Sequence, residues 1–235
     1  MIPPKIHYCW FGGAMNRKTK ECLESWKRLC PAYEIICWNE KNAPLQDNNY
    51  VRQAFEAKKW AFVSDYVRLA VLYDQGGIYL DTDVELLKPL DILLRERGVI
   101  GFESDERIAT CLMAAEPRHS FFYSAKAQYQ DMQFIRQDGS YDYMTNTERM
   151  TELFLKMGLR QDNSQQKVCE VSIYPKDFFS PKDLKTGKIC LTDNSLAIHH
   201  FQASWMPLQN RVNTKLAQML GPDGTRRVKQ WMGRG

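Results

Sequence analysis

The sequence predicts an α/β protein whose central, mostly parallel sheet carries helices on both faces. Strand patterns alternate with helix patterns along the first half of the 235-residue chain, which is the order that a parallel sheet requires. The most apolar helical pattern, over residues 61–75, leads directly into a short strand pattern at 78–80. Two motifs, at 10–13 and 81–83, follow predicted strands. Because α/β sheets bind ligands at the carboxyl ends of their strands, one cleft could hold both motifs.

The first elements are assigned from their local patterns. Residues 5–11 form an apolar strand that ends at two glycines. A helix is expected over 16–29, because its apolar residues recur at helical spacing and Pro31 follows its end. A second strand covers 33–38, and residues 39–48 form a polar loop.

The next elements along the chain are two helices, a glycine pair and a strand. A helix is expected over 50–59, and the next one, over 61–75, repeats its large apolar side chains four, three and four residues apart. Gly76-Gly77 ends this helix, because glycine accepts the left-handed conformation that closes a helix, and the strand at 78–80 starts at once. The remaining elements are strands at 99–103, 109–115, 171–175 and 196–201, and helices at 119–134 and 146–157.

Composition and charge limit the class of protein. Apolar residues make up 44% of the chain, and no stretch reaches the ~20 apolar residues of a membrane span. The N-terminus lacks a secretory signal pattern and the seven cysteines show no CxxC spacing, so we expect reduced thiols and a cytoplasmic location. Residues 207–235 contain six cations and one anion. We expect one domain over 1–206 and a basic helical tail over 207–235 that either rests on an anionic membrane surface or is simply solvated.

Asp81-Thr82-Asp83 is the most informative motif. Side chains alternate along a strand, so Asp81 and Asp83 are expected to point the same way. Two like charges aimed together repel each other unless a cation holds them, and oxygen ligands of this kind suit Mg²⁺ or Mn²⁺. Such ions usually also bind a phosphate, so the motif predicts a metal–diphosphate site.

Asp65 and Arg68 form a second candidate site. They lie three residues apart on the 61–75 helix and therefore share a face. Because the rest of that helix is apolar, we expect the pair to be at least partly buried. The pair is either an ion pair that fixes the helix, or a binding pair in which Asp65 accepts hydrogen bonds from sugar hydroxyls and Arg68 holds a carboxylate or phosphate.

Two further segments carry candidate ligand-binding side chains. Trp10 ends the first strand in front of two glycines, and its indole could stack on a flat base; the alternative is a core aromatic beside a tight turn. His199 and His200 could complete the coordination of a metal ion. Adjacent residues of a strand face opposite ways, so at most one of these histidines is expected to point into the site.

Together these segments resemble a known family. The combination of the Asp65–Arg68 pair with GG-x-Y-x-D-x-D at 76–83 is similar to the family 32 type of glycosyltransferases, which have a DxD-containing sugar-binding region. That group includes yeast-type initiating mannosyltransferases, bacterial capsular polysaccharide transferases and, more distantly, the clostridial glucosylating toxins. The resemblance is dense over 3–90, returns at 196–205 and is thin over 95–191.

The resemblance implies a GT-A fold, a nucleotide-sugar donor, a divalent cation (usually Mn²⁺, otherwise Mg²⁺) and retention of the anomeric configuration. Asp83 would ligate the metal, and Asp81 would contact the ribose and, through the metal, the diphosphate. Asp65 and Arg68 would hold the donor sugar as part of the catalytic set, and His199 or His200, with His199 favoured, would supply a late metal ligand. The other donor-binding candidates are Trp10, Phe11, Gly12, Gly13, Tyr79, Thr82, Ser204 and Trp205.

The activity implied is transfer of a sugar, with a UDP-sugar as the favoured donor, to a saccharide acceptor in capsular or other surface polysaccharide biosynthesis. We expect a lipid-linked acceptor and peripheral membrane association through the basic tail at the inner face of the membrane, and no nucleic-acid partner. Two alternatives stay open at this point. A haloacid-dehalogenase-type phosphatase would use Asp81 as nucleophile and Asp83 as acid, and a non-catalytic protein would only bind nucleotide sugars.

Overall fold

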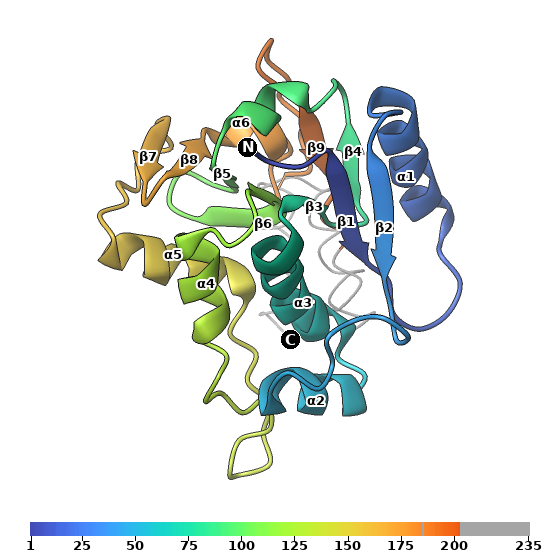
Figure 1. Ribbon diagram of the computed structural model, residues 1–235. Coiled ribbons are helices and arrows are strands. Elements are labelled where there is room, and N and C mark those ends of the chain that lie inside the picture. Colours follow the sequence, from blue (N-terminus) through green and yellow to red (C-terminus); the bar gives the residue numbers. More distant parts are fainter. Residues whose placement is uncertain (185, 203–235) are drawn as a thin grey trace, which may run out of the picture.

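A seven-stranded sheet forms the centre of the protein (Figure 1). The computed structural model describes residues 1–184 and 186–202, and in these ranges the strand order is β2-β1-β3-β6-β5-β8-β7. Five strands share one direction, while β6 and β7 run against their neighbours, which confirms the predicted mostly parallel sheet. The strands are β1 (Lys5–Cys9), β2 (Glu34–Trp38), β3 (Gly77–Leu80), β5 (Gly98–Phe102), β6 (Ile108–Ala115), β7 (Gln166–Val168) and β8 (Val171–Tyr174).

Helices cover both faces of this sheet, as predicted (Figure 1). On one face, buried side chains of four helices form a single core cluster with the sheet. These helices are α2 (Asn49–Glu56), α3 (Trp60–Gln75), α4 (Ser120–Ala127) and α5 (Asn146–Lys156). The opposite face packs against a second cluster from α1 (Arg17–Leu29), the 3₁₀ turn η1 (Asp91–Arg95) and α6 (Lys176–Phe179).

A separate two-stranded sheet brings the late histidine segment next to the chain that follows the motif at 81–83. In it, β4 (Val84–Leu86) runs antiparallel to β9 (Ala197–His199), with Val84 opposite His199. Helix α1 holds β4 in place, because the Trp26 indole N–H donates to the Val84 carbonyl at 2.8 Å. The sequence pattern did not predict β4, since three residues are too few to show a period and its partner lies far along the chain.

Helix α3 is buried on nearly all sides, and this explains its apolar sequence. Gly76 and Gly77 end it at φ values of 66° and 103°, which a glycine adopts without strain. A Cβ atom on Gly76 would also lie 2.6 Å from Pro117 and 2.8 Å from the Ala115 carbonyl oxygen. The tight exit sends the chain straight into β3, and so places the motif at 81–83 beside α3.

One predicted helix is shorter than expected. The pattern over 119–134 predicts a continuous helix, but α4 ends at Ala127. Beyond it, Tyr129 and Phe134 turn into the core, where their rings lie 4.9 Å and 5.4 Å from the ring of Tyr50. Burying two aromatic rings against Tyr50 outweighs the hydrogen bonds of two further helical turns. The short elements η1, β7 and α6 were also not predicted.

No helix in the described ranges has the length and hydropathy of a membrane span. The expected basic tail over 207–235, with Ser204 and Trp205 before it, lies outside the described residues. The boundary between residues 1–206 and 207–235 therefore stays a prediction.

Candidate active site

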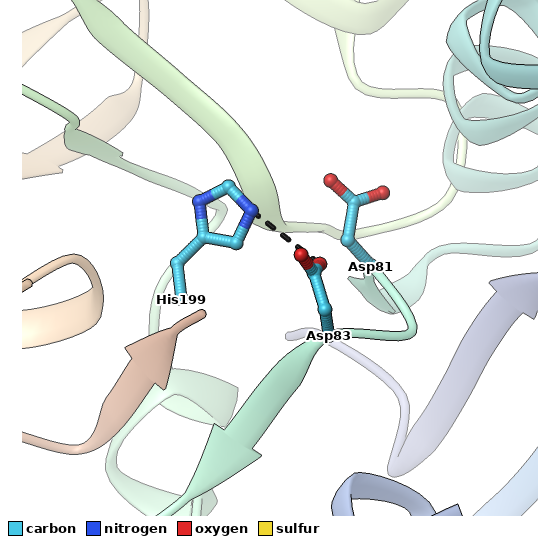
Figure 2. Close-up of side chains that lie close together, drawn as sticks. All are labelled: Asp81, Asp83 and His199. Carbon is cyan, nitrogen blue, oxygen red and sulfur yellow. Dashed lines mark ion pairs between the residues drawn. The ribbon is translucent and has the colours of Figure 1, made fainter. Parts of the chain in front are cut away.

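The motif Asp81-Thr82-Asp83 lies in the turn between β3 and β4. The motif follows the strand, as predicted, but the alternation of strand side chains does not extend over it, although its two carboxylates do converge (Figure 2). The Asp81 N–H donates to the Cys111 carbonyl of β6 at 2.8 Å, and the Val84 N–H donates to the Asp81 carbonyl at 3.0 Å. The turn, and not the two-residue period of a strand, thus aims both carboxylates at one point.

Three side chains meet at this point. A ligand atom from each of Asp81, Asp83 and His199 lies within 4.8 Å of the other two, and the His199 Nε2 is 3.4 Å from the Asp83 Oδ1 (Figure 2). Two carboxylates and one imidazole are a donor set for a divalent cation. The Gln202 N–H donates to the Asp83 Oδ2 at 2.7 Å and fixes the carboxylate from the other side. The residues present therefore fit a metal site.

Charge around Asp83 and His199 favours the ionised forms of both. Burial opposes the charge on Asp83, but the His199 ring and the Gln202 N–H outweigh it and lower the pKa of Asp83 to about 2. Burial also opposes the charge on His199, yet the Cys111 sulfur and the Asp83 carboxylate raise the pKa of His199 well above its ordinary value. The imidazole therefore pairs with Asp83, and an incoming cation would replace its proton.

His200 does not join this group. Its Nε2 lies 2.7 Å from the Glu85 Oε2, and the same carboxylate accepts a bond of 3.0 Å from Lys18. The two histidines thus face opposite sides of β9, and His199 is the one at the carboxylates. Lys18 and Glu85 also line a hollow of about 710 Å³ along α1, whose charged side chains largely pair with one another.

Arg68 connects Asp65 to Asp81 of the motif. One guanidinium nitrogen lies 3.0 Å from the Asp65 Oδ1 and 3.2 Å from the Asp81 Oδ1, and another lies 3.4 Å from the Asp81 Oδ2. Arg68 also donates to the carbonyls of Ser64 at 3.1 Å and Thr110 at 2.7 Å. Every guanidinium nitrogen has a protein acceptor, so in this structure Arg68 orients Asp81.

Burial raises the free-energy cost of keeping the carboxylates of this network charged. Asp65 is 8% exposed and Arg68 is 5% exposed. Burial raises the pKa of Asp65 to about 6, although Arg68 opposes the shift, and burial also raises the pKa of Asp81. One arginine thus balances two carboxylates beside a third, Asp83. A partly buried site with more carboxylates than cations gains free energy when a cation binds.

Two of the other predicted donor-binding residues are buried in the protein. Phe11 is 7% exposed, and its ring stacks on Trp60 at 6.1 Å between centroids, so it is a core residue. Tyr79 is 1% exposed, with its ring 4.8 Å below the Arg68 guanidinium carbon, so it supports Arg68.

The edge of the first strand is more open. Trp10 is half-buried, and its indole N–H donates to the Gly13 carbonyl at 2.8 Å. Gly12 has a φ of 82°, and its N–H donates to Glu40 at 2.7 Å. Thr82 lies half-buried in the DxD turn. Trp10, Gly13 and Thr82 therefore remain candidates for donor contact.

Some residues of this site were missed. Gln202 and Cys111 contact the metal-site residues, and Thr110 holds Arg68, but their contacts depend on strand pairing that no local pattern shows. Glu103 also lies within electrostatic reach of Asp81, Asp83 and His199, and burial raises its pKa. Its position directly after a strand that ends beside the motif is the signal that would have identified it.

The site thus combines a mostly parallel sheet, an Asp-x-Asp turn at its carboxyl edge and a histidine that completes the group. Residues 16–99 match the family model described as a glycosyltransferase sugar-binding region containing a DXD motif. Over that segment the chain is similar to this family of glycosyltransferases.

Individual relatives show how far this similarity extends. The chain is 30% identical over 138 residues to inositol phosphoceramide mannosyltransferase 1 of Schizosaccharomyces pombe, a match that covers 53% of this chain and 41% of that protein. It is 24% identical over 225 residues to an uncharacterized glycosyltransferase of Acanthamoeba polyphaga mimivirus, covering 88% and 85% of the two chains. The chain thus spans less than half of the mannosyltransferase.

Among solved structures, the PaToxG glycosyltransferase has the same fold. It aligns with a TM-score of 0.52 at 17% identity, over 66% of this chain and 69% of that chain. These relations favour the glycosyltransferase over the phosphatase, which would place its Asp-x-Asp motif on a first strand. Here the motif follows β3, the third strand of the chain.

Proposed function

We propose that this protein is a metal-dependent, retaining glycosyltransferase that transfers a sugar from a nucleotide sugar to a saccharide acceptor in surface polysaccharide biosynthesis. The observation that carries the proposal is the convergence of Asp81, Asp83 and His199 within 4.8 Å, beside the buried Asp65–Arg68 pair. The metal ligands are then Asp81, Asp83 and His199. An imidazole in the set favours Mn²⁺ over Mg²⁺, which prefers oxygen ligands alone.

The residues divide the chemistry between them. When bound, the divalent cation neutralises charge that develops on the departing diphosphate. Arg68 holds the Asp81 carboxylate through both of its oxygens, so Asp81 needs no reorganisation when the donor arrives. Asp65, on the same guanidinium, accepts hydrogen bonds from hydroxyls of the donor sugar. The nucleotide lies along β1, with its base on Trp10.

A turnover assay over a panel of donors tests the proposal. Purified protein is incubated with UDP-glucose, UDP-galactose, UDP-N-acetylhexosamines and GDP-mannose, in Mn²⁺ or in excess chelator, together with simple glycosides. We expect release of nucleoside diphosphate from one donor class, with a UDP-sugar as the favoured one, and only in the presence of the metal. Release of phosphate from p-nitrophenyl phosphate, with no nucleotide released from any donor, would instead support the phosphatase alternative.

The acceptor is expected to be lipid-linked. The name of the Schizosaccharomyces pombe relative describes transfer to inositol phosphoceramide, a lipid, and the basic segment over 207–235 suits an anionic membrane surface. On this basis the enzyme works at the cytoplasmic face of a membrane as a peripheral protein.

Deletion of residues 222–235 removes four of the six cations of that segment. We expect co-sedimentation with vesicles that contain anionic lipid to fall by roughly tenfold, because each basic residue contributes on the order of 1 kcal/mol and part of that attraction is screened. Neutral vesicles are the control. Equal co-sedimentation of the full and the shortened chain would exclude membrane binding through this segment.

A further inference from the structure

Glu103 is a carboxylate at the edge of the site that the proposed chemistry does not use. It directly follows β5, and its N–H donates to the Arg107 carbonyl at 2.7 Å to close the turn into β6. The strand β6 that leaves this turn carries Thr110, which holds Arg68, and Cys111, which holds the Asp81 N–H. Glu103 therefore lies on the hairpin that supports the catalytic turn.

The pleat of β5 sets the direction of the Glu103 side chain. Ile100 and Phe102 belong to the core cluster on the α3 side of the sheet, whereas Val99 belongs to the opposite cluster. A Cβ atom on Gly101 would meet the Phe179 ring of α6 at 2.5 Å, which places position 101 on the same side as Val99. Because strand side chains alternate, Glu103 follows 99 and 101 to the side where β9 lies.

The side chain of Glu103 is half-buried, and its carboxylate has no hydrogen bond or ion pair within the described residues. The charges that act on it most strongly are those of His199, Arg107, Asp81 and Asp83. A partly buried carboxylate without a protein partner can accept hydrogen bonds from a ligand, and such groups cluster at functional sites. Glu103 is thus an unpaired acceptor that faces the site.

The order of the strands in the sheet indicates which ligand would pair with Glu103. From one edge, the strands run β2-β1-β3-β6-β5, with Trp10 at the end of β1 and the DxD turn after β3. Glu103, after β5, lies on the far side of the DxD turn from Trp10. A carboxylate repels the diphosphate, so its partner is a neutral group that carries hydroxyls. On that side, the remaining substrate is the acceptor.

Building on the proposed function, we infer that Glu103 binds the acceptor saccharide by accepting hydrogen bonds from hydroxyls next to the one that attacks. The acceptor sugar at this position is then uncharged. Glu103 orients that sugar over the donor, and it disfavours an acceptor with an acidic group at the same place.

Substitution Glu103→Gln, which keeps the shape and removes the charge, tests the inference. The assay uses methyl glucoside, methyl mannoside, methyl galactoside and methyl glucuronide as acceptor probes, with Mn²⁺ and the donor that the wild-type protein uses. We expect the acceptor KM for the neutral glycosides to rise roughly tenfold, as for the loss of a charge-assisted hydrogen bond, while the Kd for the nucleoside diphosphate with Mn²⁺ stays unchanged. The preference for glucoside over glucuronide should also shrink, which a merely structural role would not cause.

Glu106→Gln is the matched control, because Glu106 is an exposed glutamate in the same turn. It should leave the acceptor KM and the glucoside preference as in the wild-type protein. An unchanged acceptor KM in Glu103→Gln, a parallel loss of nucleotide affinity, or wild-type transfer to none of the sugar probes would overturn the inference. If the wild-type protein releases no nucleoside diphosphate from any donor, the proposed function itself fails.

Discussion

Asp83→Ala is expected to lower metal-dependent donor turnover by at least about 1,000-fold. Asp83 pairs with the His199 ring and is fixed by the Gln202 N–H, so its removal takes away one ligand and the anchor of another. A bound metal ion supplies several kcal/mol of transition-state stabilisation, and each ~1.4 kcal/mol is tenfold in rate. The measurement is kcat for nucleoside diphosphate release at saturating Mn²⁺, with a thermal melt to verify folding.

The matched control for this variant is Asp131→Ala. Asp131 is an exposed aspartate just after α4, and its removal should leave kcat within about twofold, as for most surface substitutions. If Asp83→Ala retained turnover within tenfold of the wild-type value while remaining folded, the Asp81–Asp83–His199 site would not be the catalytic centre.

Arg68→Met is expected to cost about 3–5 kcal/mol of unfolding free energy and to abolish turnover. The substitution leaves the buried Asp65 and the partly buried Asp81 without their shared counter-charge, which is the costly way to break such an ion pair. It also removes the donors to the Ser64 and Thr110 carbonyls. Urea unfolding of both proteins, followed by far-UV circular dichroism, measures the difference.

The loss in Arg68→Met should be larger at pH 8 than at pH 5. In the intact protein, burial already raises the pKa of Asp65 to about 6, and Arg68 is what opposes a larger rise. Without Arg68, the pKa values of both carboxylates rise further, so they take up protons as the pH falls and the unpaired charges disappear. A deficit that grew toward low pH would contradict this account.

Arg52→Met provides the comparison for Arg68→Met. Arg52 forms an exposed pair with Glu56 at 3.2 Å on α2, and such surface pairs contribute about 0.3–0.5 kcal/mol. A loss of similar size in Arg52→Met and Arg68→Met would mean that burial of Arg68 has no energetic consequence.

The sequence predicted the structure correctly where the residues in contact are also close together along the chain. The spacing of Asp65 and Arg68 on an apolar helix predicted a buried pair, and the pair is bonded at 3.0 Å. Gly76-Gly77 correctly marked the passage from α3 into β3. The α/β class was also predictable, because each strand and each helix in the alternating order is recognised from its own local pattern.

Local patterns could not predict contacts between segments that are far apart along the chain. The choice of His199 over His200 depends on the pairing of β9 with β4, and β4 is too short to be recognised. Phe11 and Tyr79 were expected to contact the donor, but packing against Trp60 and Arg68 buries both. That Arg68 also holds Asp81 follows from the turn after β3, which spacing along the chain could not show.

The central claim is that a divalent cation at Asp81, Asp83 and His199 joins the diphosphate of the donor to the protein. Titration calorimetry of UDP and GDP into the wild-type protein, in Mn²⁺ and then in excess chelator, tests it most directly. The account predicts that one of the two nucleotides binds at least about 100-fold more weakly in chelator, a difference of roughly 2.7 kcal/mol. Equal affinity in both conditions would contradict the account, because the diphosphate would then be held without the metal.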